Sequence, residues 1–227
     1  GTKDVLIIEK QDKVGGTSAT SGGGIWIPNS HYAKEAGAED NPQDARAYLM
    51  NTLFGEDVPE EMIDIYLEKS PEMLKFLHDR TDVRYESLAE YPDYYTNMEG
   101  ARAGHRSLEP APIMASELGE NWKNMTWTHF MMRMFNRIHF TQVEAHLLMV
   151  QLPGWKKLLA RLMWDYIRDI PWRLKTPISR RLACGSAGVA RLYLSVLKRE
   201  IPLEFNTQMV ELIAEGDTVL GAVIECN

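Results

Sequence analysis

Residues 5–29 read VLIIEKQDKVGGTSATSGGGIWIPN, and this stretch decides the fold. It opens with an apolar run, Val5 to Ile8, that ends in the acidic Glu9. A short continuous apolar run is typical of a strand buried on both faces of a parallel sheet. A glycine pair, a hydroxylic segment and three further glycines follow. This order predicts a nucleotide-binding loop after a strand of such a sheet.

Each part of the loop has a chemical reason that points to FAD. Glu9 can accept hydrogen bonds from the ribose hydroxyls of the AMP half. A glycine pair lets the main chain turn close to a ligand, hydroxyl and N–H groups suit a pyrophosphate, and a glycine triplet brings bare backbone to the flavin ring. The loop residues expected to contact FAD are Gly15, Gly16, Thr17, Ser18, Ser21, Gly22, Gly23 and Gly24.

The first part of the usual dinucleotide motif does not precede this loop. A dinucleotide fold normally opens with a strand and G-x-G-x-x-G about twenty residues before the acidic residue, whereas eight residues precede Glu9. We therefore expect an α/β fold: a partial Rossmann-like FAD-binding domain whose parallel sheet lacks its first strand. The whole of 1–227 would belong to it, with the ribose strand and flavin loop in 1–30 and the catalytic domain absent.

Composition excludes several other classes of protein. The 227 residues carry a net charge of −7, which argues against nucleic acid as a partner. The two cysteines form neither a metal motif nor a secreted disulfide framework, so we expect a cytoplasmic protein. No stable membrane insertion is expected. The spacing of His139, Glu144 and His146 does not match a metal-ligand set, and no metal is implied.

Two segments are expected to be helical, 41–82 and the large insertion 113–200. In the first, Asn41-Pro42 and Ser70-Pro71 both look like helix starts, which predicts separate helices over 42–55, 59–69 and 71–80. The second segment carries many large apolar side chains that we assign to the core. They are Met131, Met132, Met134, Trp155, Met163, Trp164 and Trp172.

Residues 83–112 lack a helical period and are rich in Tyr, Gly and Pro, which predicts a long functional or mobile loop. Tyr91, Tyr94 and Tyr95 flank Pro92-Asp93 in this loop. Their phenols could form an aromatic wall that faces a flat apolar substrate. Tyrosines that simply cover a surface loop would give the same spacing, and are the commoner case.

The last segment, 201–227, is expected to form the adenine-side strands. Runs over 201–205, 209–215 and 219–225 read as strands, and Gly216-Asp217 between the last two is a hairpin signal. Backbone groups near Val210 would meet the polar edge of adenine. The small residues from Cys184 to Gly188 allow the following helix, 189–199, to approach a sheet or the cofactor closely, although a tight packing turn explains them almost as well.

Several motifs in order resemble a known family. IEK followed by GGTSATSGGGIWIPNS, YPDYYTNMEGARAGHRSLEP, PGWKKLLARLMWDYIRDIPWRLKTP and REIPLEFNTQMVELIAEGDTVLGAVIE are similar to segments of the fumarate reductase-type FAD flavoproteins, in the 3-ketosteroid dehydrogenase branch. Ser186-Ala187-Gly188 departs from the bulkier segment of relatives. The family's cofactor contacts map by position onto Glu9, Lys10, Gly16, Thr17, Ser21, Gly22, Gly23, Gly24 and Val210.

The resemblance implies oxidation of a CH–CH bond in a steroid substrate. A base removes the proton beside the 3-keto group, and hydride passes to the flavin N5 before an external acceptor takes the electrons. Tyr94 matches the first tyrosine of the family's site, with a supporting role in tuning the base. The base and the carbonyl clamp would lie beyond Asn227, so we expect this chain to be inactive by itself.

Two alternatives remain open from the sequence. A fumarate or other dicarboxylate reductase would share the flavin loop, but it needs arginines to hold substrate carboxylates. A non-catalytic flavin-binding piece, or a subunit whose partner chain supplies the missing strand and tyrosines, would also share the loop.

Overall fold

The computed structural model describes residues 4–226 and has mixed α/β architecture. Its helices are α1 (Gly16–Thr20), α2 (His31–Glu35), α3 (Pro42–Asn51), α4 (Glu60–Arg80), α5 (Gln142–Met149), α6 (Trp155–Arg168), α7 (Ile170–Arg173) and α8 (Cys184–Lys198), with 3₁₀ helices η1 (Ala115–Asn124) and η2 (Phe130–Met132). Its strands are β1 (Ile7–Ile8), β2 (Ile25–Trp26), β3 (Tyr85–Ser87), β4 (Ser107–Pro110), β5 (Ile113–Met114), β6 (Arg133–Met134), β7 (Ile138–His139), β8 (Arg181–Leu182), β9 (Leu203–Glu204), β10 (Thr207–Glu215) and β11 (Thr218–Cys226).

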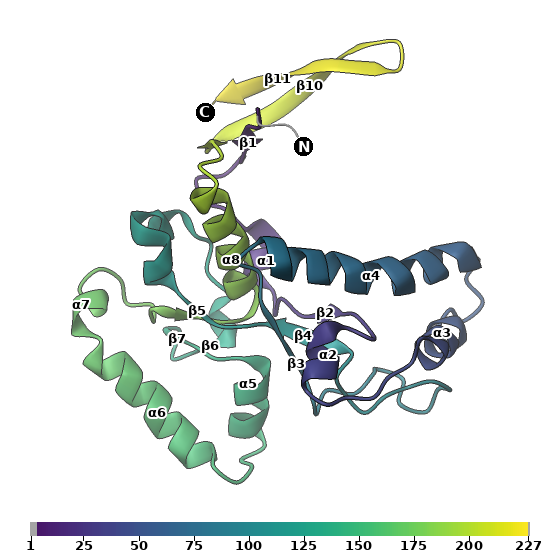
Figure 1. Ribbon diagram of the computed structural model, residues 1–227. Coiled ribbons are helices and arrows are strands. Elements are labelled where there is room, and N and C mark those ends of the chain that lie inside the picture. Colours follow the sequence, from purple (N-terminus) through teal and green to yellow (C-terminus); the bar gives the residue numbers. More distant parts are fainter. Residues whose placement is uncertain (1–3, 227) are drawn as a thin grey trace.

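Helix α8 occupies the middle of the molecule (Figure 1). It packs with η1 and β8 in a buried cluster that includes Trp122, Trp172 and Leu182. Helices α2, α3 and α4 lie to one side of it and α5, α6 and α7 to the other. The helix begins at Cys184, five residues before the expected start, because the small residues from 184 to 188 form its first turn instead of preceding it.

The parallel sheet is a pair of short strands, β1 and β9, in which Ile7 lies opposite Leu203 and Ile8 opposite Glu204. The expectation of a strand buried on both faces was wrong: Ile7 and Ile8 are half-buried, and the first half of the run is exposed. Val5 and Leu6 are exposed and precede the paired residues. The reason is that β9 is the partner of β1 within residues 4–226, so this part of the run has little to pack against.

Helix α4 runs without interruption through Pro71, so the expected break between 59–69 and 71–80 was wrong. Ile63, Ser70 and Leu74 are buried along one face of it, and their spacing keeps them on a single stripe across the proline. Leu74 packs in a buried cluster with Tyr32 of α2 and Leu108 of β4. Burial of the stripe outweighs the cost of proline in a helix interior. The Asn41 cap was correct: its side chain accepts the Asp44 N–H at 2.7 Å.

The helical insertion also contains the short pairs β5–β8 and β6–β7. The assignment of its Met and Trp residues to the core was wrong for Met131 and Trp164, which are 76% and 63% exposed, and correct for Trp172. Trp164 lies on α6, whose Leu158 and Leu162 are its buried residues. Helix α6 thus has one buried face, and Trp164 lies outside it.

The segment 83–112 is not structureless, because strands β3 and β4 form at its two ends. They build a three-stranded antiparallel sheet in the order β2-β4-β3. The loop that carries the tyrosines is therefore held at both ends by the central strand and its neighbour.

The hairpin signal at Gly216-Asp217 was correct, and β10 and β11 pair antiparallel around it. The hairpin extends away from the rest of the described chain beyond β1 (Figure 1). Its apolar side chains, among them Leu212, Ile213 and Leu220, are exposed.

His139 on β7 is a buried neutral imidazole. Its Nδ1 lies 3.1 Å from Ser179 Oγ, and that hydroxyl donates to the Arg181 carbonyl at 3.0 Å. Because the serine proton is already used, Nδ1 carries the proton in the first contact. Burial, with Arg133 and Arg181 nearby, lowers the pKa of His139 to about 3.

This imidazole should make the fold sensitive to acid. In the unfolded chain a histidine takes up a proton below about pH 6.5, whereas folded His139 stays neutral down to about 3. The unfolded state therefore binds more protons in this window, and the free energy of unfolding falls as the pH is lowered through it. Between about pH 6.5 and about pH 4.5 we expect a loss due to His139 of up to about 2.7 kcal/mol, and urea denaturation at the two pH values would measure it.

His139→Gln should lose less free energy of unfolding over the same step. His146→Gln is the matched control, because His146 is exposed on α5 and the variant should keep the wild-type pH dependence. Equal pH dependence in wild type and His139→Gln would contradict this assignment.

Candidate functional site

The flavin loop turns at Gly15, which has a left-handed φ of 114° and precedes α1. A Cβ at this position would lie 2.6 Å from the Cβ of Ala19 and 3.0 Å from a methyl of Val189 on α8. Glycine is therefore required both for the turn and for the close packing of α1 on α8.

A second close approach joins the end of the loop to the first turn of α8. The Gly185 N–H donates to the Ser21 carbonyl at 3.0 Å. A Cβ on Gly23 would lie 2.7 Å from the Gly185 nitrogen, and a Cβ on Gly185 would lie 2.0 Å from the Ser18 carbonyl oxygen. Of the two explanations for the small residues at 184–188, tight packing against this loop is the one the described contacts support.

Another part of the loop stays open. A Cβ on Gly16, whose φ is +47°, would meet nothing within 4 Å. Thr17 and Ser18, which follow it, are exposed. Ser21 is exposed too, but its hydroxyl donates to the Ser18 carbonyl at 2.8 Å and accepts the Gly23 N–H at 3.0 Å. The loop thus combines a rigid inner side with an accessible outer side, which fits a cradle for an anionic cofactor.

Glu9 lies at the carboxyl end of β1, as the sequence predicted. Its N–H donates to the Glu204 carbonyl at 2.8 Å, and its carbonyl accepts the Thr207 N–H at 2.9 Å. One carboxylate oxygen accepts the Gln11 N–H at 2.8 Å. The two main-chain hydrogen bonds fix the backbone of Glu9. A carboxylate can accept about four hydrogen bonds, so the Glu9 side chain still has acceptor capacity for ribose hydroxyls. Lys10, the next residue, is exposed.

Val210 lies at an irregular position of the hairpin. Met209 pairs with Ile224 and Glu211 with Val223, so Val210 has no residue directly opposite it. Such a bulge interrupts the hydrogen-bond ladder and leaves main-chain groups available. Because Thr207 is bonded to Glu9, Val210 is about 10 Å along the strand from the acidic residue.

Helix α8 links the two ends of this cradle. Its first turn contacts the flavin loop through Gly185, and the chain after its last turn enters β9 beside Glu9. Its 15 residues correspond to a length of about 22 Å. The acidic tip and the glycine triplet are therefore held apart along one helix, the arrangement that an extended dinucleotide requires.

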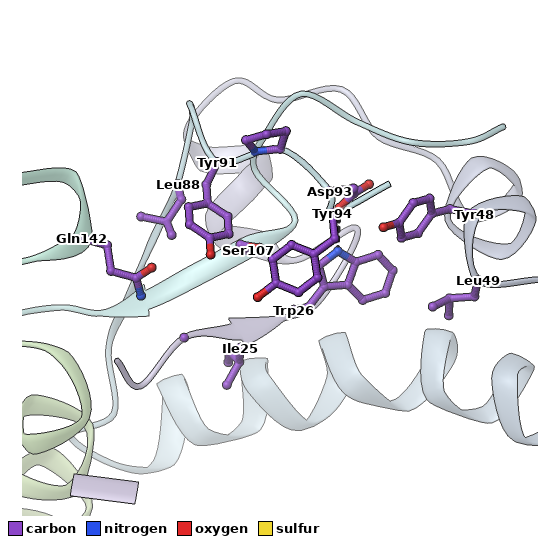
Figure 2. A pocket seen from close by; sticks show the side chains of 12 residues that line it. Ile25, Trp26, Tyr48, Leu49, Leu88, Tyr91, Asp93, Tyr94, Ser107 and Gln142 are labelled. Atoms are coloured by element: carbon purple, nitrogen blue, oxygen red, sulfur yellow. Dashed lines mark hydrogen bonds between the residues drawn. The ribbon is translucent and has the colours of Figure 1, made fainter. Parts of the chain in front are cut away.

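A pocket of about 330 Å³ lies next to Gly24 at the end of the flavin loop. It is lined by residues of β2, α3, the tyrosine loop, β4 and α5, and the Trp26 ring is seen between Tyr94 and Tyr48 (Figure 2). Tyr91 and Tyr94 line it and Tyr94 is 83% exposed, whereas Tyr95 packs against Phe54 with ring centroids 5.0 Å apart. Two of the three tyrosines thus line a pocket, and the third packs on the surface; that the pocket tyrosines face a substrate stays a prediction.

The two phenols of the pocket act as a pair. A hydrogen bond to Tyr94, followed by burial, raises the pKa of the Tyr91 hydroxyl. Tyr91 and Tyr94 therefore lie close enough for their hydroxyls to influence each other.

The tyrosine loop is anchored by residues whose roles the sequence does not reveal. Asp93, between the two pocket tyrosines, accepts the Trp26 indole N–H at 2.7 Å and an Arg106 N–H at 2.8 Å. Arg106 is 2% exposed and also binds both carboxylate oxygens of Asp40, at 2.8 and 2.9 Å. Its guanidinium carbon lies 5.7 Å from the Trp26 ring centre. These contacts tie the tyrosine loop to the strand that follows the flavin loop.

Residue spacing could not have revealed this anchor, because its bonded members lie up to 67 positions apart. The available signal was weaker: an acidic residue within the apolar, aromatic YPDYY segment needs a buried partner or an exposed position.

The fold and the site together define a flavoprotein of the dinucleotide-binding class. A family model described as a FAD binding domain matches residues 1–227, and the chain belongs to that family. Its cofactor is FAD. None of the helices formed by residues 4–226 combines the length and the apolar character needed to cross a bilayer.

Individual proteins and solved structures show which members of the family the chain is similar to. The chain is 31% identical over 229 residues to the 3-oxosteroid 1-dehydrogenase of Comamonas testosteroni, covering 98% of this chain and 39% of that protein. It matches the crystal structure of 3-ketosteroid delta1-dehydrogenase from Sterolibacterium denitrificans, in complex with 1,4-androstadiene-3,17-dione, with a TM-score of 0.91 and 35% identity, covering 99% of this chain and 40% of that one. A third relative, 4-oxocyclohexanecarboxylate 2-dehydrogenase of Sinomonas cyclohexanicum, is 38% identical over 108 residues, 48% of this chain and 19% of that protein.

These matches confirm the family resemblance of the sequence motifs. The chain spans about two fifths of the length of the two relatives that it matches over nearly all its residues.

The Arg106 anchor should contribute strongly to stability. Arg106→Met leaves the buried Asp93 carboxylate without its cation and Asp40 with only the longer Arg102 contact at 3.5 Å, which should lower the free energy of unfolding by about 3–5 kcal/mol in urea denaturation. Lys75→Met is the matched control, since Lys75 and Asp79 form an exposed pair at 2.5 Å, and should change it by less than about 1 kcal/mol. Similar values for both variants would contradict the role assigned to Arg106.

Proposed function

We propose that this chain provides the FAD cradle and one wall of the substrate pocket in a dehydrogenase that acts on the ring of a 3-ketosteroid. The observation that carries the proposal is the position of the tyrosine-lined pocket directly beside the flavin loop. The similarity to the 3-ketosteroid delta1-dehydrogenase structure, with its TM-score of 0.91, supports it.

The residues of the chain have separate roles in this proposal. Glu9 and the bulge at Val210 bind the AMP half of FAD, with Lys10 beside them. The flavin loop binds the pyrophosphate and the flavin ring, and its residues in this role are Gly15, Gly16, Thr17, Ser18, Ser21, Gly22, Gly23 and Gly24. FAD supplies the hydride acceptor when bound. Tyr94 supports proton transfer at the pocket wall, with the Tyr91 hydroxyl beside it.

The pocket favours an apolar ketone over a carboxylate substrate. Its described lining contains no lysine or arginine, and its one charged residue, Asp93, is engaged by Trp26 and Arg106. A dicarboxylate, or the 4-oxocyclohexanecarboxylate named for one relative, needs a cation to hold it. The remaining lining is mainly aromatic and aliphatic, which suits a steroid ring.

We propose further that an external acceptor reoxidises the flavin and that the enzyme works in the cytoplasm. The low cysteine content and the net charge of −7 support a reducing compartment and a small-molecule substrate.

A substrate panel tests the proposed reaction. The intact protein, supplied with FAD and an artificial acceptor dye, should turn over a 3-ketosteroid in preference to 4-oxocyclohexanecarboxylate, and should not exchange electrons with fumarate. Tyr94→Phe should lower kcat by at least about tenfold, because a phenol that supports proton transfer is lost, with flavin absorbance unchanged. Turnover of the carboxylates alone would overturn the steroid assignment.

Glu9→Ala should lower FAD occupancy. The variant loses the carboxylate that accepts ribose hydrogen bonds, each worth about 1.5–3 kcal/mol when charge-assisted, so the affinity for FAD should fall at least about tenfold. The ratio of flavin to protein absorbance after purification measures the effect. Glu204→Ala is the control, because Glu204 contacts Glu9 through its main chain; equal occupancy in Glu9→Ala and Glu204→Ala would remove the role of Glu9.

A further inference from the structure

Gln142 lies where the flavin loop meets the tyrosine pocket. Its side-chain Nε2 donates to the Gly22 carbonyl at 3.5 Å, and a Cβ on Gly24 would lie 3.1 Å from the same nitrogen. Gln142 also lines the pocket together with Tyr91 and Tyr94. Figure 2 shows its amide along the same edge of the pocket as the two tyrosine hydroxyls. One side chain thus contacts both halves of the site.

The backbone of Gln142 is held by a buried carboxylate. Glu109, which is 0% exposed, accepts the Gln142 N–H at 2.7 Å and the Val143 N–H at 3.5 Å. These N–H groups belong to the first turn of α5 and have no partner within the helix, and a negative charge is favoured at this end of a helix. Glu109 lies on β4, the strand that pairs with β2 directly after the flavin loop. The start of α5 is therefore fixed to the same sheet as the flavin loop.

The Gln142 amide retains hydrogen-bonding capacity. A primary amide offers two N–H donors and two acceptor lone pairs, and the described hydrogen bonds of residues 4–226 use one donor, on Gly22. The pocket lining beside it carries tyrosine hydroxyls and no cation. A flavin ring presents carbonyl oxygens and an N–H on its pyrimidine edge, the kind of edge that an amide binds. Contact with Gly22 places the amide on the flavin-loop side of the pocket rather than on the far wall.

We propose that Gln142 is a positioning residue that binds the flavin ring through its side-chain amide and holds the Gly22–Gly24 backbone at the edge of the substrate pocket. This inference rests on the proposed function, because it requires that FAD occupies the loop. Glu109 acts through Gln142 by fixing the first turn of α5.

The test compares FAD binding in the intact protein and three variants. Gln142→Leu removes the amide at similar size, Gln142→Glu keeps the length and replaces the N–H donors by acceptors, and Val143→Ala is the matched control on the same helix, at an exposed side chain. Fluorescence titration with FAD gives the affinity, the visible spectrum reports the flavin environment, and thermal unfolding of the FAD-free protein reports the fold.

We expect Gln142→Leu and Gln142→Glu to bind FAD about tenfold more weakly, the loss of roughly one hydrogen bond. Their visible flavin bands should shift, whereas Val143→Ala should match the wild type. If Gln142→Leu lowers the unfolding temperature of the FAD-free protein, the FAD affinity and spectrum of Gln142→Glu test the inference in its place. Wild-type affinity and spectrum in the properly folded variant would overturn the inference. Failure of the wild-type protein to bind FAD would instead overturn the proposed function.

Discussion

The constraint on which the site depends is the direct main-chain contact between the flavin loop and helix α8. Gly23 and Gly185 approach so closely that a Cβ on either residue would overlap backbone atoms of the other segment. Side chains cannot relax away from such a contact, because the obstructing atoms are main chain on both sides. The loop therefore has one conformation against α8, and its outer side at Gly16 is left free for a ligand. Rigidity of this kind lets a cofactor bind without the cost of ordering its loop.

A second, electrostatic contact extends that order to the substrate side. Arg106 forms ion pairs with two buried carboxylates, those of Asp40 and Asp93, and Asp93 also accepts a hydrogen bond from the Trp26 indole. Buried pairs of this type are costly to desolvate and gain little net stability over apolar packing, yet they tolerate few alternative geometries. Here the geometry keeps two phenols beside the end of the flavin loop. The cradle and the pocket wall are thus fixed by different chemistry and share strand β2 and its Trp26.

The sequence predicted the parts of this arrangement whose chemistry is local. Glu9 and the glycine loop could be placed because the order of residue types along a short stretch carries the signal, as did Gly216-Asp217 for the hairpin. Arg106, Asp93 and Gln142 could not, since their roles arise from contacts between segments far apart in the chain. The helix break predicted at Pro71 was wrong, because the local effect of the proline is outweighed by a buried stripe of the helix that continues past it. The assignment of Met131 and Trp164 to the core was wrong, because composition does not reveal which face of a helix or strand is covered.

The length of α8 has an evolutionary consequence. One end of this helix is locked to the flavin loop and the other leads into the strand beside Glu9. Inserting or deleting a single residue would rotate one end against the other by about 100° and displace it by about 1.5 Å. Substitutions on its surface leave that spacing intact, whereas a change in residue number breaks it. Related chains that keep this cofactor should therefore vary in the composition of the helix and conserve its number of residues.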